Sequence, residues 1–588
     1  MANHYVDSAA AGGGDGTIGT PWNTIAQVNG HTFAADDFIY FKCGSTFRET
    51  LTITQSGTAG HPITYGSYDS GALPAISGAD LLATWTKHDT NIWKATVTLD
   101  YGPLVVLFDG AVGTPVASIV ACDTALDWYW AANVLYVYAP GDADPSVTYA
   151  TPGVEAGTRY WGITAAADDV DYITLQDFRI YGTGNLDYPK AIRNYNCRNW
   201  TYSGLTIDKN AGDGIFAVNA RYHTVTGCTV TGIRALTTNK KGVLFDCNSA
   251  VGAAYTPGHN TVSLNTIQYW PDSAVQMQGE TSALRQTNFA VEHNNLDHSC
   301  SGCYVQWADT GTIHENSCDD NLVGGYLAGE DYGIALQTVS NAVIDGNVCT
   351  NGRVGMEIWA YTGVAFPTAG PSDNNKVYQN TISGNTSYGF YIYEGNADNT
   401  EVYNNIIFDN AKAGIGLNDH NTGYESTGCT CYHNTLYCND TGSDGYGDIY
   451  VGYACAGWTI KNNIIFNTNK LCFHAGVTFG GTHTNNCYYR ATGNVIEDDT
   501  DTYALAAVTD FEATAIAADP TLANGGGTTA EDYKLLSGSP CIDAGVDVGI
   551  STDYFNGIRP VGTAPDIGAN EYIPAGYKIQ ESFRMVKV

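Results

Sequence analysis

The sequence is short of basic residues. It contains 26 Lys and Arg against 60 Asp and Glu, so its formal net charge is −34. This acidic excess argues against nucleic acid or an anionic membrane as a partner, and it disfavours a polyanionic substrate unless a local basic patch overrides it. The chain also lacks any run of 18 apolar residues, so the sequence predicts no transmembrane helix and no membrane insertion.

Residues that favour helices are sparse as well, and only 15% of the residues are charged. Thr, Val, Ile, Tyr, Asn and Gly are abundant instead, which favours an all-β chain with many turns. With 588 residues, the chain is too long to fold around one compact core. It must therefore form several domains or grow by repetition.

A short motif, V-x-x-N-x-I, recurs along the chain at steps of 29, 22, 31, 33, 25, 29 and 29 residues. Its shared amides are Asn265, Asn294, Asn316, Asn347, Asn380, Asn405, Asn434 and Asn463. Unequal steps around a constant motif indicate stacked coils joined by loops of varying length. The prediction is a right-handed, single-stranded parallel β-helix, in which Val and Ile fill interior columns and each Asn bonds the next Asn along a ladder.

A second strand follows each of these Asn residues, usually eight or nine positions later. Its second and fourth residues are apolar and are expected to point inward, while its third and fifth are expected to form a wet outer face. This outer strip is rich in Gln, Tyr, Trp, Asn and Glu, and its two columns as counted from residue 214 contain no Lys or Arg. Such a strip is predicted to bind a glycan, although amide and tyrosine stacks could simply stabilise a sheet.

Long connections after residues 279, 360 and 418, and an insertion at 319–331, are expected to form the walls of a cleft over this strip. The residues predicted to bind substrate there are Trp359, Tyr391, Tyr393, Gln306, Gln337, Gln278, Tyr304, Asp419, Arg353 and Arg285.

Hydrolysis of a glycosidic bond needs two carboxyl groups. Glu357 is the best single candidate, because a position near Trp359 would favour the protonated form that a proton donor needs. Its partner could be Asp331, Asp309 or Glu394, and the sequence leaves these alternatives open.

A lyase would instead need a base and a group that neutralises a uronate. Arg353, Arg285, Tyr304 and Tyr391 are the candidates on the strip, whereas the densest basic stretch, "KAIRNYNCR" (190–198), lies at the start of the predicted helix. No cofactor is required, but carboxylates on neighbouring coils could bind Ca²⁺. The identity of any metal remains open.

Several segments resemble secreted, pectate-lyase-like parallel β-helix proteins. They are "YVDSAAAGGGDGTIGTPWNTIAQV" (5–28), residues 36–78, "WYWAANVLYVYAPGDADPSVTY" (128–149) and residues 537–572. The resemblance implies an N-terminal cap with the first coils (1–80), a small β insertion (81–155), the main helix (156–490) and a C-terminal cap and tail (491–588). It carries over no catalytic set, because this superfamily includes lyases, hydrolases, epimerases and virion tailspikes.

The expected protein is an extracellular enzyme that cleaves a polysaccharide or cell-surface glycan. A glycoside hydrolase is preferred, because the predicted floor is neutral to acidic and aromatic. The alternatives are a polysaccharide lyase acting on a uronate-containing glycan and a non-catalytic adhesin or tailspike. A monomer would suit the enzyme and a homotrimer the tailspike. The first residues, "MANHYVDSAAAGGGDG", are no signal peptide, so secretion would require a signal removed from this sequence or a route such as a virion.

Overall fold

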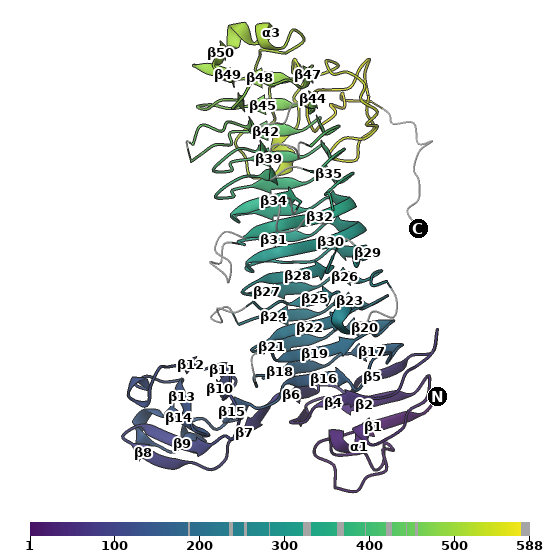
Figure 1. Cartoon of the computed structure of the whole chain (residues 1–588), viewed down its shortest axis with the longest axis vertical. Helices are drawn as coiled ribbons and strands as arrows, with labels where there is room; N and C mark the ends of the chain where they lie inside the picture. Colours follow the sequence, from purple (N-terminus) through teal and green to yellow (C-terminus); the bar gives the residue numbers. More distant parts are fainter. Residues whose placement is uncertain are drawn as a thin grey trace. The chain divides into compact units, whose positions relative to one another are not determined.

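The computed structural model of the chain (Figure 1) describes residues 1–185, 188–233, 239–251, 256–281, 283–321, 331–360, 370–393, 396–418, 426–442, 444–452 and 457–577. These residues fall into two compact units, here called unit 1 (chiefly residues 1–339) and unit 2 (chiefly residues 340–588). No helix in the described part of the chain is long and apolar enough to cross a membrane.

Unit 1 is built of coils whose strands form three parallel sets. The first set contains β4 (Leu51–Ile53), β16 (Trp161–Ala165), β19 (Lys190–Tyr195), β22 (Asp213–Val218), β25 (Val243–Asp246), β28 (Ser273–Gln278) and β30 (Ser301–His314). The second contains β5 (Ile63–Tyr68), β17 (Ile173–Gln176), β20 (Trp200–Ser203), β23 (Thr224–Thr226), β26 (Thr261–Ser263) and β29 (Gln286–Glu292). The third contains β3 (Thr46–Phe47), β6 (Ala75–Ser77), β18 (Arg179–Tyr181), β21 (Thr206–Asp208), β24 (Thr229–Thr231) and β27 (Thr266–Gln268).

The alternation of the strands decides which side chains enter the core of unit 1. Ile163, Ile192, Ile215 and Val243 occupy one column of the first set, and all four are completely buried. The neighbouring residues along each strand point away from this column. The inward position predicted for Ile215 is therefore confirmed, and the apolar column also includes strands that the prediction did not cover.

Two smaller groups of strands flank the coils of unit 1. The N-terminal residues form β1 (Asn3–Val6), β2 (Phe38–Lys42) and the short helix α1 (Ile25–Asn29), whose first turn is capped by Thr24. Residues 79–157 form one sheet from β7 (Ala79–Leu81), β10 (Val106–Phe108), β11 (Ala111–Val112) and β15 (Val154–Gly157). They form another from β8 (Thr86–Asp89), β9 (Ile92–Thr96), β12 (Thr114–Pro115), β13 (Asp127–Ala131) and β14 (Val134–Tyr138).

Unit 2 repeats the same construction. Its first set contains β34 (Val354–Trp359), β37 (Phe390–Tyr393), β40 (Ile415–Asn418), β43 (Ile449–Val451), β46 (Phe473–Ala475) and β49 (Asn494–Asp498). Its second contains β35 (Lys376–Tyr378), β38 (Glu401–Tyr403), β41 (Thr430–Tyr432), β44 (Thr459–Lys461) and β47 (Thr482–Thr484). Its third contains β33 (Val348–Thr350), β36 (Thr381–Ser383), β39 (Ile406–Phe408), β42 (Thr435–Tyr437), β45 (Ile464–Phe466) and β48 (Cys487–Tyr489). The pairings within these sets are parallel, so each unit is a parallel β-helix.

The predicted asparagine ladders are present in both units. In unit 1, Asn265 Nδ2 donates to Asn294 Oδ1 (2.9 Å), and Asn294 Nδ2 donates to Asn316 Oδ1 (2.9 Å). The ladder of unit 2 begins at Asn347 and ends where Asn486 Nδ2 donates to Glu512 Oε2 (2.9 Å). The left-handed residue at these turns is the one before the ladder Asn, for example His293 (φ 55°). The amide therefore stabilises the turn by hydrogen bonding, while its neighbour takes the strained backbone conformation.

The C-terminal segment of unit 2 covers the outer side of the third set. Tyr533 and Ala569 pack with Ile406, Phe408 and Tyr437 in one apolar cluster. A buried ion pair lies in the same segment, where Arg559 Nε donates to Glu571 Oε2 (3.1 Å). Arg559 Nη1 also donates to Asn404 Oδ1 (3.0 Å), which ties the segment to a turn of the coils.

Candidate functional site

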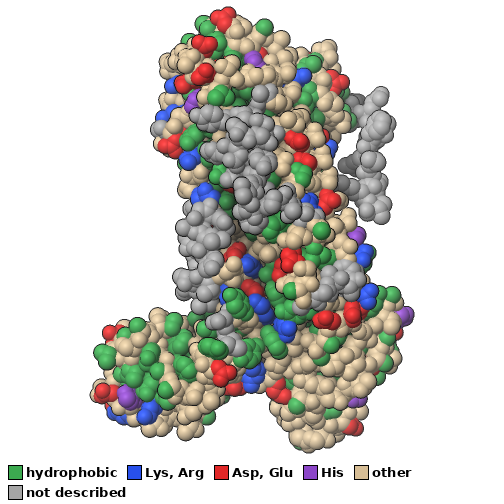
Figure 2. Space-filling model, in the orientation of Figure 1, with side chains coloured by type: hydrophobic (Ala, Val, Ile, Leu, Met, Phe, Trp, Pro, Cys, Tyr) green, Lys and Arg blue, Asp and Glu red, His purple; other side chains and the backbone are tan. Residues whose placement is uncertain are grey.

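A cleft of about 790 Å³ lies over the outward face of the first strand set in unit 1. It is lined by Trp161, Tyr188, Lys190, Arg193, Tyr195, Asp213, Phe216, Asn239, Lys240, Lys241, Leu244, Asp246 and Gln278. Figure 2 shows Lys and Arg side chains gathered beside hydrophobic ones at the level of these strands. Charged, aromatic and amide groups thus meet in one concave surface, as binding sites for polar ligands require.

The floor of this cleft follows from the register of adjacent strands. Arg193 of β19 pairs with Phe216 of β22, which pairs with Leu244 of β25. Two positions further along, Tyr195 and Val218 lie in the column that continues to Asp246. These are the outward positions of the strands, because the residues between them enter the core.

Three lysines of the cleft are buried, with Lys190, Lys240 and Lys241 being 7%, 3% and 8% exposed. Lys190 forms an ion pair with Asp213, and Lys241 Nζ lies 3.2 Å from a carboxylate oxygen of Asp272. Burying ammonium groups is costly unless they are paired. The ion pairs with Asp213 and Asp272 therefore compensate the burial of Lys190 and Lys241 and hold these two ammonium groups at the cleft.

Arg193 is held in place by aromatic rings. Its guanidinium carbon lies 4.4 Å from the ring centroid of Trp161 and 4.2 Å from that of Tyr195. Within the described residues, Arg193 forms no ion pair with a carboxylate. Its five N–H donors are thus oriented by stacking on the two rings.

Asp246 adds a titratable group beside these cations. Burial raises its pKa from 3.8 to about 6, and the nearby carboxylates of Glu280 and Asp213 act in the same direction, while Lys241 opposes them. The side chain therefore changes its charge within the pH range in which proteins work.

The predicted residues of unit 1 divide between this cleft and the neighbouring strands. Gln278 lines the cleft. Gln306 Nε2 donates to Gln337 Oε1 (2.6 Å), and Tyr304 OH donates to the same oxygen. Both glutamines are buried, so these three side chains bond one another instead of presenting free groups to solvent.

Of the other predicted residues of unit 1, Arg285 and Asp331 lie just before strands, and Asp309 lies within β30. Arg285 Nη1 donates to the carbonyl oxygen of Ala308 (3.3 Å), and Asp309 is half-buried on β30. Asp331 is buried, and its carboxylate lies 3.1 Å from Cys300 Sγ. None of these three lines the cleft.

In unit 2, Glu357 and Trp359 sit side by side on β34, opposite Tyr391 and Tyr393 of β37. Alternation along the strand predicts that both side chains are exposed to solvent, but Glu357 is only 6% exposed and Trp359 only 8%. The two outward columns pack against one another, since the rings of Tyr391 and Tyr393 stack with centroids 5.7 Å apart. Burial also raises the pKa of Tyr391, whose hydroxyl accepts a hydrogen bond from Asn418 Nδ2 (3.0 Å).

Further tyrosines lie near Tyr388 and Tyr391, and together these rings are called the tyrosine floor of unit 2. The ring of Tyr446 lies 4.7 Å from that of Tyr450, and Lys412 Nζ lies 5.3 Å from the ring centroid of Tyr388. Arg353 is half-buried just before β34. Two other predicted residues, Glu394 and Asp419, lie outside the described residues.

Part of the basic cleft lies on strands before residue 214, where the predicted outward columns begin. The strand "KAIRNY" (190–195) has the same alternation as the later strands and puts Arg193 and Tyr195 into the two outward columns. The strand "VLFD" (243–246) likewise puts Asp246 into the outward column that contains Tyr195 and Val218. The expectation that these columns lack basic residues is therefore corrected for unit 1.

One group of side chains within the described part of the chain could hold a metal ion, namely His293, His314 and Glu315. It does not line the cleft.

The family described as "Right handed beta helix region" matches residues 190–360 and 328–488, which together span 299 of the 588 residues. No curated protein sequence matches the chain significantly.

In fold, the chain is similar to the structure of XylC in complex with xylose, with 13% identity, 97% of this chain and 98% of that chain covered, and a TM-score of 0.50. It is also similar to the GH136 lacto-N-biosidase from Eubacterium ramulus (14% identity, 78% and 66% covered, TM-score 0.38). A third similar structure is an alginate lyase from Paenibacillus sp. (12% identity, 72% and 99% covered, TM-score 0.37). At such low identity, likeness extends to the fold alone.

Proposed function

This chain belongs to the family of right-handed β-helix proteins, and we propose that it binds an acidic polysaccharide in the cleft of unit 1 and cleaves it. The observation that carries the proposal is the gathering of Lys190, Arg193, Lys240 and Lys241 around one cleft in a chain of net charge −34. A local excess of cations in an acidic protein supports an anionic ligand, because the field at the site opposes that of the molecule as a whole.

The rest of the lining supports a sugar as the carrier of that negative charge. Tyr188 is 70% exposed and presents an aromatic face, while Asn239 and Gln278 offer amide groups. Amides hydrogen-bond hydroxyl groups as donors and acceptors, and aromatic faces pack against the apolar faces of pyranose rings. A small inorganic anion would use neither feature.

Among the possible reactions, β-elimination on a uronate fits the cleft best. In this reaction a base removes the proton at C5, the bond from C4 to the leaving oxygen breaks, and a double bond forms between C4 and C5. Arg193 would pair with the uronate carboxylate and so stabilise the charge that develops next to it. Tyr195 and Lys240 are the candidates for the base, and protonated Asp246 could return a proton to the leaving oxygen.

Glycoside hydrolysis is a second candidate, favoured by Glu357 in unit 2. This carboxyl is buried beside Trp359, and its register partner on the next coil is Tyr391. Glu357 would then be the proton donor of a hydrolase that binds a neutral glycan on the tyrosine floor. In either case we propose that the protein works outside the cell, where polysaccharides are found.

A screen against uronate-containing and neutral polysaccharides tests the proposal. We expect new reducing ends together with ultraviolet absorbance from unsaturated products, on uronate polymers only. Reducing ends without absorbance would support the hydrolase instead. Binding without any product would contradict cleavage and support a non-catalytic adhesin or tailspike, for which a trimer in light scattering would be a second sign.

A further inference from the structure

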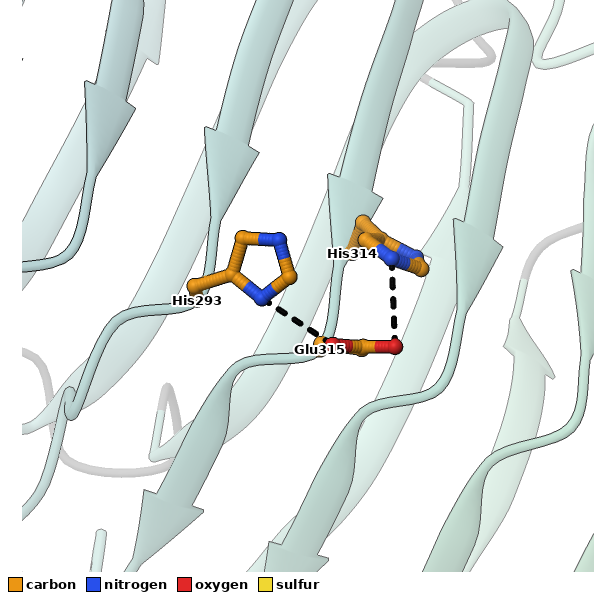
Figure 3. A group of neighbouring side chains, drawn as sticks. All are labelled: His293, His314 and Glu315. Carbon is orange, nitrogen blue, oxygen red and sulfur yellow. Dashed lines mark ion pairs between the residues drawn. The ribbon is translucent and has the colours of Figure 1, made fainter. Parts of the chain in front are cut away.

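Two imidazoles and a carboxylate meet on the surface of unit 1, where β29 and β30 end (Figure 3). His293 Nδ1 lies 3.0 Å from Glu315 Oε2, and His314 Nε2 lies 3.3 Å from Glu315 Oε1. All three candidate ligand atoms lie within 4.8 Å of one another. The side chains are 43%, 25% and 55% exposed for His293, His314 and Glu315, so an ion in solution can reach them.

The backbone fixes the positions of these residues. Glu292 and His314 are partners in the register of β29 and β30, so His293 and Glu315 follow at equivalent places on neighbouring coils. Both have left-handed φ angles, 55° for His293 and 49° for Glu315. The next residues, Asn294 and Asn316, join the two turns through the buried amide ladder (2.9 Å). The ligand group is therefore assembled before any ion arrives, which lowers the entropy cost of binding.

We propose that His293, His314 and Glu315 form a binding site for a divalent transition-metal ion, with Zn²⁺ as the best match. Zinc takes imidazole nitrogen and carboxylate oxygen at about 2.0–2.2 Å, with water in any remaining position. Small rotations of the exposed side chains would bring the three atoms around one ion. Ca²⁺ and Mg²⁺ fit poorly, because both prefer a shell of oxygen ligands.

The bound ion would join two successive coils from outside, parallel to the ladder inside. It would replace the contacts between Glu315 and the two imidazoles, which are otherwise exposed ion pairs of small energetic value. The expected consequence is stabilisation of unit 1 by mass action, since the unfolded chain does not hold the three ligands together.

The chain supplies a matched control. His298 Nε2 lies 3.4 Å from Asp320 Oδ2 in the same unit, with similar exposure, but among the described residues this pair does not belong to a group of three candidate ligands. If the contacts at His293 were only ion pairs, substitution of His298 would affect zinc binding as much as substitution of His293 and His314.

The test uses the full chain without a histidine tag and freed of metal by chelation. Calorimetric titration with ZnCl₂ should give one ion per chain, and CoCl₂ should produce visible absorption bands from nitrogen and oxygen ligation. The double variant His293→Asn with His314→Gln should lose this binding and the zinc-dependent rise in unfolding temperature, and Asn at position 293 tolerates the positive φ. The variant His298→Gln should behave as the wild type.

Titrations with CaCl₂ and MgCl₂ should show no binding that depends on His293 and His314. Absence of zinc binding in the wild type would overturn the proposal. Equal binding in the double variant would overturn it as well, because the ion would then sit elsewhere in the chain. Circular dichroism of the double variant must match the wild type, and Glu315→Gln provides a second variant with the backbone unchanged.

Discussion

The guanidinium of Arg193 stacks over the indole of Trp161, with 4.4 Å between its central carbon and the ring centroid. The two residues come from the adjacent strands β19 and β16. A stacked arginine keeps its charge and loses much of its freedom, so less entropy is lost when it pairs with a ligand carboxylate. This pair gives Arg193 a defined orientation in the cleft.

Replacing Arg193 should therefore weaken the binding of an acidic oligosaccharide. We expect Arg193→Gln to lower affinity about 10- to 100-fold, because a hydrogen bond to a charged group contributes about 1.5–3 kcal/mol. Calorimetric titration with a uronate oligomer measures the effect. Arg221→Gln is the control, since Arg221 also stacks on a tyrosine (4.9 Å from Tyr222) but lies outside the cleft. Equal losses in both variants would remove the cleft from consideration.

The charge of Asp246 should make ligand binding depend on pH. Its pKa of about 6 means that the side chain is mainly neutral below pH 6 and mainly negative above it. A negative charge in the cleft repels an anionic glycan, so affinity should fall as the pH rises through about 6. Asp246→Asn should bind with the same affinity at pH 5 and pH 8. A wild-type affinity that stays constant over this range would argue against Asp246 as a neighbour of the ligand.

Substitution of Glu357 separates the two candidate reactions. Since the proposed elimination takes place in the cleft of unit 1, Glu357→Gln should retain turnover of a uronate polymer, whereas Arg193→Gln should lose most of it. The measurement is the initial rate of absorbance increase, with the fold of each variant checked by circular dichroism. If Glu357→Gln folds normally and loses all turnover, the hydrolase with Glu357 as proton donor becomes the better explanation.

The buried asparagine ladder should stabilise unit 2 strongly. Asn405 is fully buried, donates to Asn434 Oδ1 (2.9 Å) and accepts from Asn380. Asn405→Ala leaves several buried partners unsatisfied, so it should lower the free energy of unfolding by about 2–4 kcal/mol. Urea denaturation provides the value. Asn374→Gly is the matched control, because Asn374 joins an exposed amide stack and Gly keeps its positive φ. This variant should change stability by less than about 1 kcal/mol.

Asp448 should make the stability of unit 2 depend on pH. It is fully buried, accepts hydrogen bonds from Asn439 and Asn467, and burial raises its pKa to about 7. Because the folded state holds this proton more tightly than the unfolded state, stability should fall as the pH rises from about 4 to about 7 and then level off. The difference between wild type and Asp448→Asn in urea midpoints, measured from pH 4 to pH 8, isolates this contribution.

The exposed Asp510 provides the control for Asp448. Asp510→Asn should leave the pH dependence as it is in the wild type. If the urea midpoint of Asp448→Asn falls between pH 4 and pH 7 as steeply as that of the wild type, another group causes the loss of stability. Asp566, whose pKa is raised to about 6 by burial, would then be the next residue to replace.

Much of the fold could be predicted from local patterns. Asn294 and Asn316 recur at the same position of the V-x-x-N-x-I motif, which indicated stacked coils and a hydrogen bond between these two amides. Such a ladder forms wherever neighbouring coils have the same turn. The inward positions of Ile215 and Val275 followed from alternation with a period of two. The solvent exposure of the outward positions could not be predicted, since it depends on what packs over them, as the burial of Glu357 shows.

The sequence by itself determined an all-β chain of stacked coils, its ladder positions and its inward columns, because each depends on short patterns along the chain. Only the tertiary structure decided that Arg193, Lys241 and Asp246 share a cleft and that His293 lies beside Glu315. The shared motif aligns successive coils in the sequence, but it does not say which of the aligned outward pairs stay open in a cleft and which are covered by other parts of the chain. The hydrogen-bonded register of adjacent strands sets those pairs, and it exists only once the coils have stacked.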